Sequence, residues 1–245
     1  MPKIAIIAAM EGEIRPLVKS WPSKIIRYER FDYTFHESLL TVAVAAGIGP
    51  EAARRAAEAV IVNYHPEILI SAGVAGALVS ELQVGDTIFP AIVLDTRDGS
   101  RHPTAIGNAP LGNTSLGRTT LASYPEVASV AQKLQLAKSY GAHAVDMEAA
   151  EVARAAQKHN LQFLAVKAIS DELNFEIPEM SRFIRNGQFA TAAFAAHLAL
   201  RPWLWVRVFR LARNTQLASE NLCAWLRDSA LTNTIVPGTH KLHQL

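Results

Sequence analysis

The sequence contains one cysteine, Cys223, among 245 residues. A single cysteine excludes an intramolecular disulfide framework and a zinc site built from several cysteines, and it is typical of a reducing compartment. The chain also lacks any run of about 18 apolar residues without charge, so no helical membrane span is expected. We therefore expect a cytoplasmic protein.

The sequence also has little excess charge of either sign. Lys and Arg number 24 against 22 Asp and Glu, a formal net charge of +2, which is too small to indicate nucleic-acid binding. The 8 histidines are scattered without the spacing of metal ligands, so neither a metal nor another cofactor is expected. The apolar start over residues 4–9 lacks a signal-peptide cleavage pattern and predicts a core strand.

Half of the residues are hydrophobic, enough for one sizeable core. Apolar runs bounded by Gly, Asp or Pro are typical of strands buried on both faces of a largely parallel sheet. They predict strands over 3–9, 40–46, 67–72, 86–94 and 161–169. Ala-rich stretches between them predict helices over 50–64, 127–139 and 149–159, which indicates an α/β fold. The segment 96–117 has no periodicity and is expected to be an excursion of the chain on the surface. From Phe189 onward the pattern predicts helix.

Polar residues follow several of these apolar runs, where ligands bind in open α/β sheets. Glu11 and Glu13 follow the first, a Gly-rich turn over 71–77 follows the third, and Ser170 and Asp171 end the last. A further pair of acids, including Glu148, interrupts an apolar stretch at a strand-to-helix junction. Each of these acids and the serine also fits the simpler role of an acidic or capping residue at a helix N-terminus. Their convergence on one edge of the sheet nevertheless favours a functional site.

These motifs resemble the nucleoside phosphorylase and nucleosidase family. The resemblance covers about residues 3–175, is closest to the methylthioadenosine and adenosylhomocysteine nucleosidase branch, and extends to the hopanoid-associated phosphorylases. Its motifs are Ala-Met-Glu-Gly-Glu at 9–13, Ala-Gly-Ile-Gly at 46–49, Ser-Ala-Gly-Val-Ala-Gly at 71–76, Val-Asp-Met-Glu at 145–148 and Ala-Ile-Ser-Asp at 168–171. The resemblance implies a three-layer α/β/α nucleoside phosphorylase fold with a mixed central sheet.

The resemblance also implies roles for individual residues. Asp171 matches the general acid that protonates the purine, with Ser170 beside it. Glu148 matches the carboxylate that accepts hydrogen bonds from the ribose hydroxyls, and Met147 matches the residue packed against the sugar. Glu13 matches the carboxylate that activates the nucleophilic water. Gly73, Val74, Tyr124 and Val127 fall where relatives contact substrate.

Departures from the family pattern leave the nucleophile open. Gly12 replaces the middle acid of a triple-Glu run, and Val74 stands where many relatives have a serine. The Arg that some phosphorylases place before the glycine turn is replaced by Ser71. Phosphate requires cationic or backbone donors, for which Arg54 and Arg55 are candidates, although on a helix they are more often solvated.

The C-terminal part is basic and contains two Trp residues over 201–213. As a helix it would place Leu204, Trp205, Val208, Phe209 and Leu211 on one side and three arginines on the other. Such a helix either docks on its own domain or a partner subunit, or lies peripherally on an anionic membrane surface. We expect a catalytic domain over 1–200 and a helical extension with a tail over 201–245.

The leading functional hypothesis is cleavage of the N-glycosidic bond of a purine nucleoside, by hydrolysis of 5′-methylthioadenosine or S-adenosylhomocysteine. The alternative within the family is phosphorolysis of adenosylhopane, with phosphate as co-substrate. A third reading is a nucleoside-binding or membrane-associated protein without turnover, against which the presence of Glu13, Glu148 and Asp171 argues. Because relatives in the nucleosidase branch are commonly dimers, a homodimer is expected.

Overall fold

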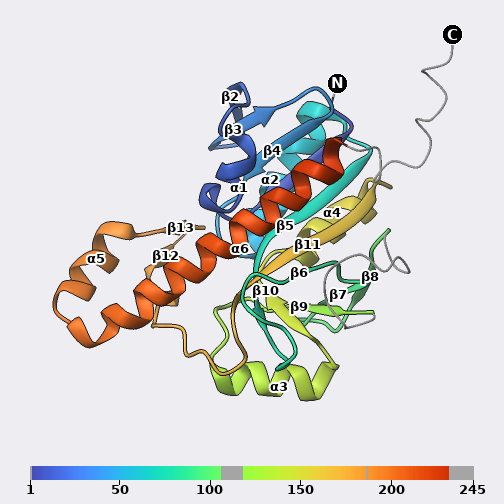
Figure 1. Cartoon of the computed structure of the whole chain (residues 1–245). Coiled ribbons are helices and arrows are strands. Elements are labelled where there is room, and N and C mark those ends of the chain that lie inside the picture. The colour runs from blue at the N-terminus through green and yellow to red at the C-terminus, as the bar shows by residue number, and fades with distance from the viewer. Residues whose placement is uncertain (1, 106–117, 186, 232–245) are drawn as a thin grey trace, which may run out of the picture.

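A mixed β-sheet forms the centre of the molecule (Figure 1). The computed structural model describes residues 2–105, 118–185 and 187–231. Within these ranges the strands are β1 (Ile4–Ala8), β2 (Ser23–Tyr28), β3 (Phe31–Glu37), β4 (Thr41–Ala45), β5 (Ile68–Ala77), β6 (Thr87–Ile88), β7 (Ile92–Asp95), β8 (Arg101–Pro103), β9 (Thr120–Ser123), β10 (Ala144–Asp146), β11 (Gln162–Asp171), β12 (Ile184–Arg185) and β13 (Gln188–Phe189).

The strand order places two long parallel strands at the middle of the sheet. The order is β2-β3-β4-β1-β5-β10-β9-β7-β8, while β11 pairs with β5 and β6. The parallel pairs at the centre are β1 with β4, β1 with β5, and β5 with β11. The pairs β3 with β4 and β5 with β10 are antiparallel. The carboxyl ends of the parallel strands therefore meet at one edge.

Helices cover both faces of the sheet. They are α1 (Glu11–Val18), α2 (Pro50–Tyr64), α3 (Val130–Tyr140), α4 (Ala149–Lys158), α5 (Thr191–Ala199) and α6 (Trp205–Leu231), with short 3-10 turns at Ser181–Phe183 and Pro202–Leu204. Alternate residues of β1 face opposite layers, as the pleat requires. Ile4 and Ile6 pack in a core with α1 and α6, and Ala5 and Ile7 pack in a core with α2 and α4. This is the expected three-layer α/β/α arrangement with a mixed sheet.

Helix α2 coincides with the helix expected over 50–64, and its ends follow from local chemistry. Gly49 has φ +95, a conformation that favours glycine, and Pro50 occupies the first turn, where its missing N–H has no intrahelical acceptor to lose. His65 ends the helix in the left-handed region.

Two expected strands differ from the structure. The strand expected over 86–94 is divided into β6 and β7, because Pro90 between them has no N–H to donate to a ladder and its carbonyl accepts from Thr104 Oγ1 at 2.8 Å. The turn expected over 71–77 is instead the second half of β5, which pairs with β11 as far as Gly76.

The hairpin β2–β3 at one edge of the sheet was not predicted. Most residues of β2 are exposed, so the strand lacks the apolar run used to find the others. Part of the excursion expected over 96–117 forms β8, and residues 106–117 lie outside the described residues.

The C-terminal part consists of a short strand and two helices, where the sequence pattern predicted continuous helix. Phe189 belongs to β13, and the chain turns at Pro202 between α5 and α6. Residues 187–214, which we call the arm, project from the body in Figure 1. None of the helices in the described ranges is long and apolar enough to cross a membrane.

The second half of α6 is part of the main core, although it lies within the extension expected over 201–245. Ala218, Leu222, Cys223 and Leu226 are buried beside β1 and α1. The side chains expected on one face of the 201–213 segment are also divided: Trp205 and Phe209 are exposed, whereas Val208 and Leu211 line a cavity. Residues 232–245 lie outside the described residues.

Candidate active site

A cavity of about 470 Å³ opens where β1, β10 and β11 end. Its inner wall carries the carboxylates of Glu13, Glu148 and Asp171. Its outer wall is apolar and consists of Ile177, Met180, Ile184, Phe189, Phe194, Val208, Leu211 and Ala212, so the arm closes one side. Cavities of this size with a few convergent polar groups are typical of small-molecule sites.

Glu13 lies in the first turn of α1 and is almost completely buried. Its Oε2 atom accepts hydrogen bonds from the backbone N–H groups of Ala9 at 3.1 Å and Met10 at 3.4 Å. Burial raises the pKa of Glu13 to about 7, even though Lys167 and these N–H groups act in the opposite direction. A carboxylate with this pKa both takes up and releases a proton near neutral pH.

Glu148 immediately precedes α4, and backbone donors hold its carboxylate. Oε1 accepts from the N–H of Gly49 at 2.7 Å, and Oε2 accepts from the N–H of Met147 at 3.2 Å. Burial, followed by the charge of Asp146, raises the pKa of Glu148, while Lys167 opposes the shift. Met147 lines the cavity beside it.

Asp171 ends β11 and is buried at the cavity wall. Its Oδ1 atom accepts a hydrogen bond from Ser170 Oγ at 2.7 Å. Its Oδ2 atom accepts a short hydrogen bond from the ammonium group of Lys133, which also donates to the carbonyl of Glu172 at 2.8 Å. Lys133 is itself buried.

A second buried lysine, Lys167, lies behind the cavity. Its Nζ atom is 2.9 Å from Asp146 Oδ2 and 3.0 Å from Ser71 Oγ. The pKa of Lys167 is raised: burial opposes the charged form, but the carboxylates of Asp146 and Glu148 more than offset burial. Asp146 also accepts from Ser123 Oγ at 2.6 Å, which fixes the pair.

Glycines of β5 make room for these polar groups. A Cβ atom at Gly73 would lie 2.9 Å from Glu13 Oε2, so a side chain there would displace the carboxylate. Gly73 therefore supports the site from behind, while its neighbour Val74 lines the cavity directly, as does Val127.

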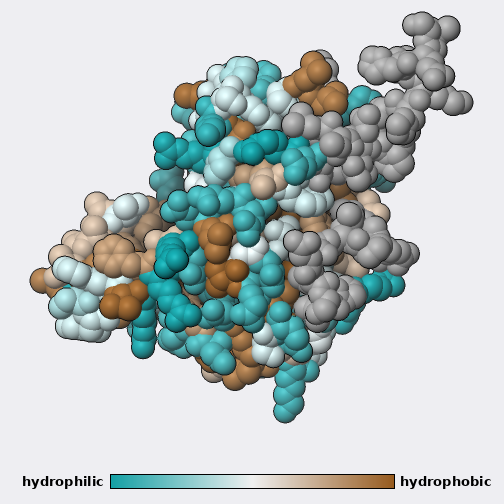
Figure 2. All heavy atoms as spheres, viewed as in Figure 1, coloured by the Kyte–Doolittle hydropathy of each residue, from teal (hydrophilic) through white to brown (hydrophobic). Residues whose placement is uncertain are grey.

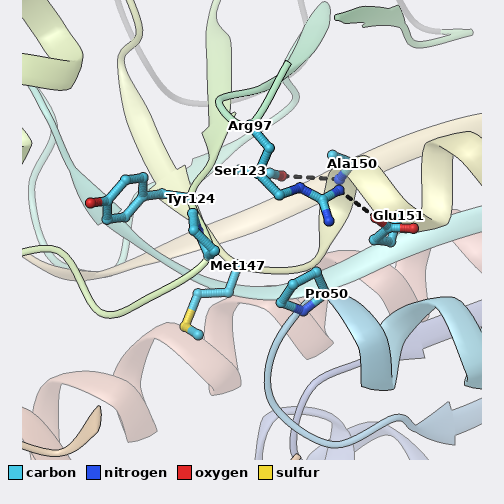
Figure 3. A pocket seen from close by; sticks show the side chains of 8 residues that line it. Pro50, Arg97, Ser123, Tyr124, Met147, Ala150 and Glu151 are labelled. Carbon is cyan, nitrogen blue, oxygen red and sulfur yellow. Dashed lines mark hydrogen bonds and ion pairs between the residues drawn. The ribbon is translucent and has the colours of Figure 1, made fainter. Parts of the chain in front are cut away.

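Tyr124, an expected base contact, lies elsewhere. It borders a shallow depression on the other side of Met147, together with Arg97 and Glu151, which pair with each other (Figure 3). The Tyr124 hydroxyl donates to Glu126 Oε1 at 3.1 Å.

The two candidate phosphate ligands also lie away from the cavity, as is usual for arginines on a helix. Arg54 and Arg55 both pair with Glu51, at 2.7 Å and 3.2 Å. Arg55 additionally stacks on Phe31, with its guanidinium carbon 4.2 Å from the ring centroid. Neither arginine lines the cavity.

Sequence reasoning missed both lysines and the arm's contribution to the cavity. Lys167 interrupts an apolar run in a strand buried on both faces, and a lysine there must be paired, so a signal existed. Lys133 carries no comparable signal, because a lysine in a helix is usually exposed. In the described ranges, no group of three or more His, Cys, Asp or Glu side chains is arranged to hold a metal ion.

The family model described as Phosphorylase superfamily matches residues 3–128 and 103–200. The chain belongs to the phosphorylase superfamily. Membership agrees with the resemblance found in the sequence motifs, and it places the carboxylates described above in a family of enzymes that act on purine nucleosides.

Curated relatives within the superfamily are similar over most of their length. The 5′-methylthioadenosine/S-adenosylhomocysteine nucleosidase of Bacillus licheniformis is 25% identical over 197 residues, which cover 69% of this chain and 85% of the relative. The protein of the same name from Staphylococcus aureus strain MRSA252 is 28% identical over 207 residues, covering 73% of this chain and 90% of the relative.

Solved structures of the superfamily confirm the fold. The Helicobacter pylori 5′-methylthioadenosine/S-adenosylhomocysteine nucleosidase, in complex with a substituted pyrrolidin-3-ol, has a TM-score of 0.69 and 18% identity, covering 94% of this chain and 97% of that chain. The futalosine hydrolase of Helicobacter pylori has a TM-score of 0.68 and 18% identity, with the same coverage of 94% and 97%.

Proposed function

We propose that the protein hydrolyses the N-glycosidic bond of 5′-methylthioadenosine and S-adenosylhomocysteine and releases adenine. The observation that carries this proposal is the convergence of Glu13, Glu148 and Asp171 on one cavity, in a chain that belongs to the superfamily. The names of the curated relatives support this choice of substrates.

Glu13 activates the attacking water in this mechanism. Hydrolysis needs a base that takes a proton from water as the oxygen attacks the anomeric carbon, and a pKa of about 7 suits that task. The backbone N–H groups of Ala9 and Met10 fix the carboxylate through Oε2 at the cavity lining.

Glu148 holds the ribose. Its two oxygens already accept from Gly49 and Met147, and each retains capacity to accept from a sugar hydroxyl. The same negative charge stabilises the cationic sugar that develops as the bond to the base breaks. Met147 packs against the sugar.

Asp171 protonates the leaving base, and Ser170 orients it through the hydrogen bond to Oδ1. The electron pair of the breaking C–N bond then passes to a base that leaves as a neutral molecule. Val74 and Val127 contribute apolar contacts to the bound nucleoside.

Water is favoured over phosphate as the nucleophile. Of the cationic side chains that the structure describes, only Lys133 is on the cavity lining, and it is neutralised by Asp171. Lys167, behind the lining, is neutralised by Asp146. Arg54 and Arg55 are engaged with Glu51 at the surface. A phosphate dianion would therefore meet the carboxylates of Glu13, Glu148 and Asp171 and no unpaired cation in the described part of the cavity.

The apolar outer wall accommodates the 5′ substituent. Phe189, Phe194, Val208 and Leu211 offer apolar surface to an alkylthio group. A thioether buries well against such side chains, whereas a 5′-phosphate would lose its hydration without gaining a partner.

The deciding experiment is adenine release from 5′-methylthioadenosine by the purified protein, with and without inorganic phosphate. Phosphate-independent release, with free 5-methylthioribose as the sugar product, supports the proposal. Release that requires phosphate and yields the 1-phosphate contradicts hydrolysis. Binding without release from any 5′-substituted adenosine contradicts the enzymatic function itself.

We also propose that the enzyme is a cytoplasmic homodimer whose arm contacts an anionic membrane surface. Leu200, Trp203, Val206 and Phe209 of the arm are exposed, and the arm at the left of Figure 2 presents mainly apolar surface. No Asp or Glu occurs between Glu179 and Glu220, whereas several arginines do, which suits an anionic bilayer.

Two measurements separate these interactions. The proposal predicts that the wild type sediments with phosphatidylglycerol vesicles but not with phosphatidylcholine vesicles. It also predicts that a Trp203→Ala/Phe209→Ala double variant no longer sediments with either. Analytical ultracentrifugation without lipid tests the dimer. A variant that still sediments with anionic vesicles rules out this patch as the membrane contact.

A further inference from the structure

The lysine that pairs with Asp171 is not explained by its contribution to the fold. Lys133 lies in the first turn of α3, where the helix dipole disfavours a positive charge. Its side chain is only 1% exposed, and desolvating an ammonium group opposes folding. Because an apolar residue at a buried position is often as stable as an ion pair, the placement of this charge points to another role.

The surrounding chain is built to accommodate the pair. Ser129 and Gln132 form a reciprocal capping box at the start of α3, which fixes the turn that carries Lys133. Across the site, a Cβ atom at Gly76 would lie 2.8 Å from Asp171 Oδ2 and 3.3 Å from Lys133 Cε. Only a residue without a side chain leaves room for both groups.

The hydrogen bonds of Asp171 place an ammonium donor directly against its carboxylate. Oδ1 accepts from Ser170, and Oδ2 accepts from Lys133. Both carboxylate oxygens are therefore occupied as acceptors, and the donor on Oδ2 is an ammonium group with three N–H bonds. A proton that passes through Asp171 to a leaving base has a source in direct contact with that carboxylate.

We propose that Lys133 is a positioning residue that supplies the proton which Asp171 passes to the leaving base; this inference rests on the proposed function. As the C–N bond breaks, its electron pair moves to the base. One proton moves from Lys133 Nζ to Asp171 Oδ2, and the Asp171 carboxyl group passes one proton to the base nitrogen, so Asp171 ends the step as it began. Lys133 is left as a neutral amine and regains a proton from solvent, which balances the proton that Glu13 takes from the attacking water and releases to solvent.

The test compares two leaving groups in the full-length enzyme. One substrate is 5′-methylthioadenosine, whose base must be protonated. The other is 4-nitrophenyl 5-methylthio-β-D-riboside, whose nitrophenolate leaves as an anion. Lys133→Met should lower kcat for the first by about 100-fold, the scale of general acid catalysis, with KM changed less than about threefold. The nitrophenyl riboside should lose less than about threefold in kcat.

Arginine separates proton supply from mere charge. Lys133→Arg retains a positive donor, but a guanidinium does not release its proton in proteins. We expect Lys133→Arg to remain impaired on 5′-methylthioadenosine while cleaving the nitrophenyl riboside normally. Lys138→Met, an exposed lysine on the same helix, is the matched control and should behave as wild type on both substrates.

A double variant tests whether the two residues act in series. In an Asp171→Asn background, adding Lys133→Met should change adenine release by less than about threefold, because the step that uses the lysine is already lost.

Each remaining outcome overturns the inference. Equal losses on both substrates would make Lys133 a structural residue. Full rescue by arginine would reduce its role to charge and orientation, and an unchanged Lys133→Met enzyme would remove any role. A wild-type protein that releases no base from any adenine nucleoside would overturn the proposed function, and with it this inference.

Discussion

Lys167 Nζ lies 2.9 Å from Asp146 Oδ2, with both side chains buried behind the cavity. The lysine is also the main cation that faces Glu13 and Glu148, because it opposes the rise in pKa of both carboxylates. One ammonium group therefore offsets much of the negative charge on the inner wall.

Lys167→Met should destabilise the protein by about 3–5 kcal/mol, because it leaves the buried Asp146 charge unpaired. Adding Asp146→Asn should recover much of that loss, since the neutral amide needs no counter-ion. Urea denaturation of the wild type, both single variants and the double variant measures the coupling. Additive single effects would show that the two residues do not form an energetic pair.

The rate of hydrolysis should rise with pH through about 7. Glu13 must be ionised to accept a proton from water, and its pKa is raised to about 7. Ionisation of Glu148, whose pKa is also raised, acts in the same direction because the ionised carboxylate holds the sugar more strongly. A profile of kcat/KM between pH 5 and 9 measures this, and a decrease in rate from pH 6 to 8 would contradict the role of Glu13.

Glu13→Gln should abolish hydrolysis and stabilise the fold at alkaline pH. Below its ordinary pKa of 4.5 the carboxyl group is protonated in both the folded and unfolded states; as the pH rises to 7 the unfolded state loses the proton first. Above pH 7 the folded state carries the full cost of a buried charge, about 3 kcal/mol, which glutamine avoids. The stabilisation should therefore appear between pH 5 and 7 and remain above it.

The matched control for this variant is Glu11→Gln, an exposed glutamate on the same helix. It should leave the free energy of unfolding unchanged within about 0.5 kcal/mol at every pH. Thermal and urea unfolding at pH 5 and pH 8 provide the comparison. A Glu13→Gln variant no more stable than wild type at pH 8 would show that the carboxylate is better solvated than its burial indicates.

Gly76→Ala should reduce adenine release strongly, because the new methyl group would displace the Asp171 carboxylate that lies 2.8 Å from the Cβ position. We expect a loss of at least about 100-fold in kcat, as for other removals of a general acid. Gly12→Ala is the control, since nothing lies within 4 Å of its Cβ position. Wild-type activity in Gly76→Ala would show that Asp171 has room to move.

The sequence predicts the parallel centre of the fold well because burial on both faces leaves a clear apolar signature. Helix α2 was predicted to the residue, since Gly49, Pro50 and an Ala-rich stretch act together. The hairpin β2–β3 escaped prediction because its first strand is mostly exposed and pairs through its backbone. Backbone hydrogen bonds form with any side chain, so such a strand is not recognised from its residue types.

The site was predictable where a motif places an acid at a strand end. Glu13, Met147, Glu148 and Asp171 all line the cavity. Long-range pairing was not predictable: Lys133 and Asp171 are 38 positions apart in the sequence, and only the fold brings them into contact. Arg54 and Arg55 were candidate phosphate ligands in the sequence, but the structure pairs both with Glu51 of the same helix, away from the cavity.

Helix α6 contributes to the cavity wall through Val208 and Leu211, and to the main core through Leu222 and Leu226. The outer wall of the site thus depends on residues near the end of the described chain. During synthesis, the sheet and its carboxylates leave the ribosome well before this helix does. A nascent chain therefore presents an open, incomplete pocket, and the finished enzyme acquires its substrate enclosure only when helix α6 docks.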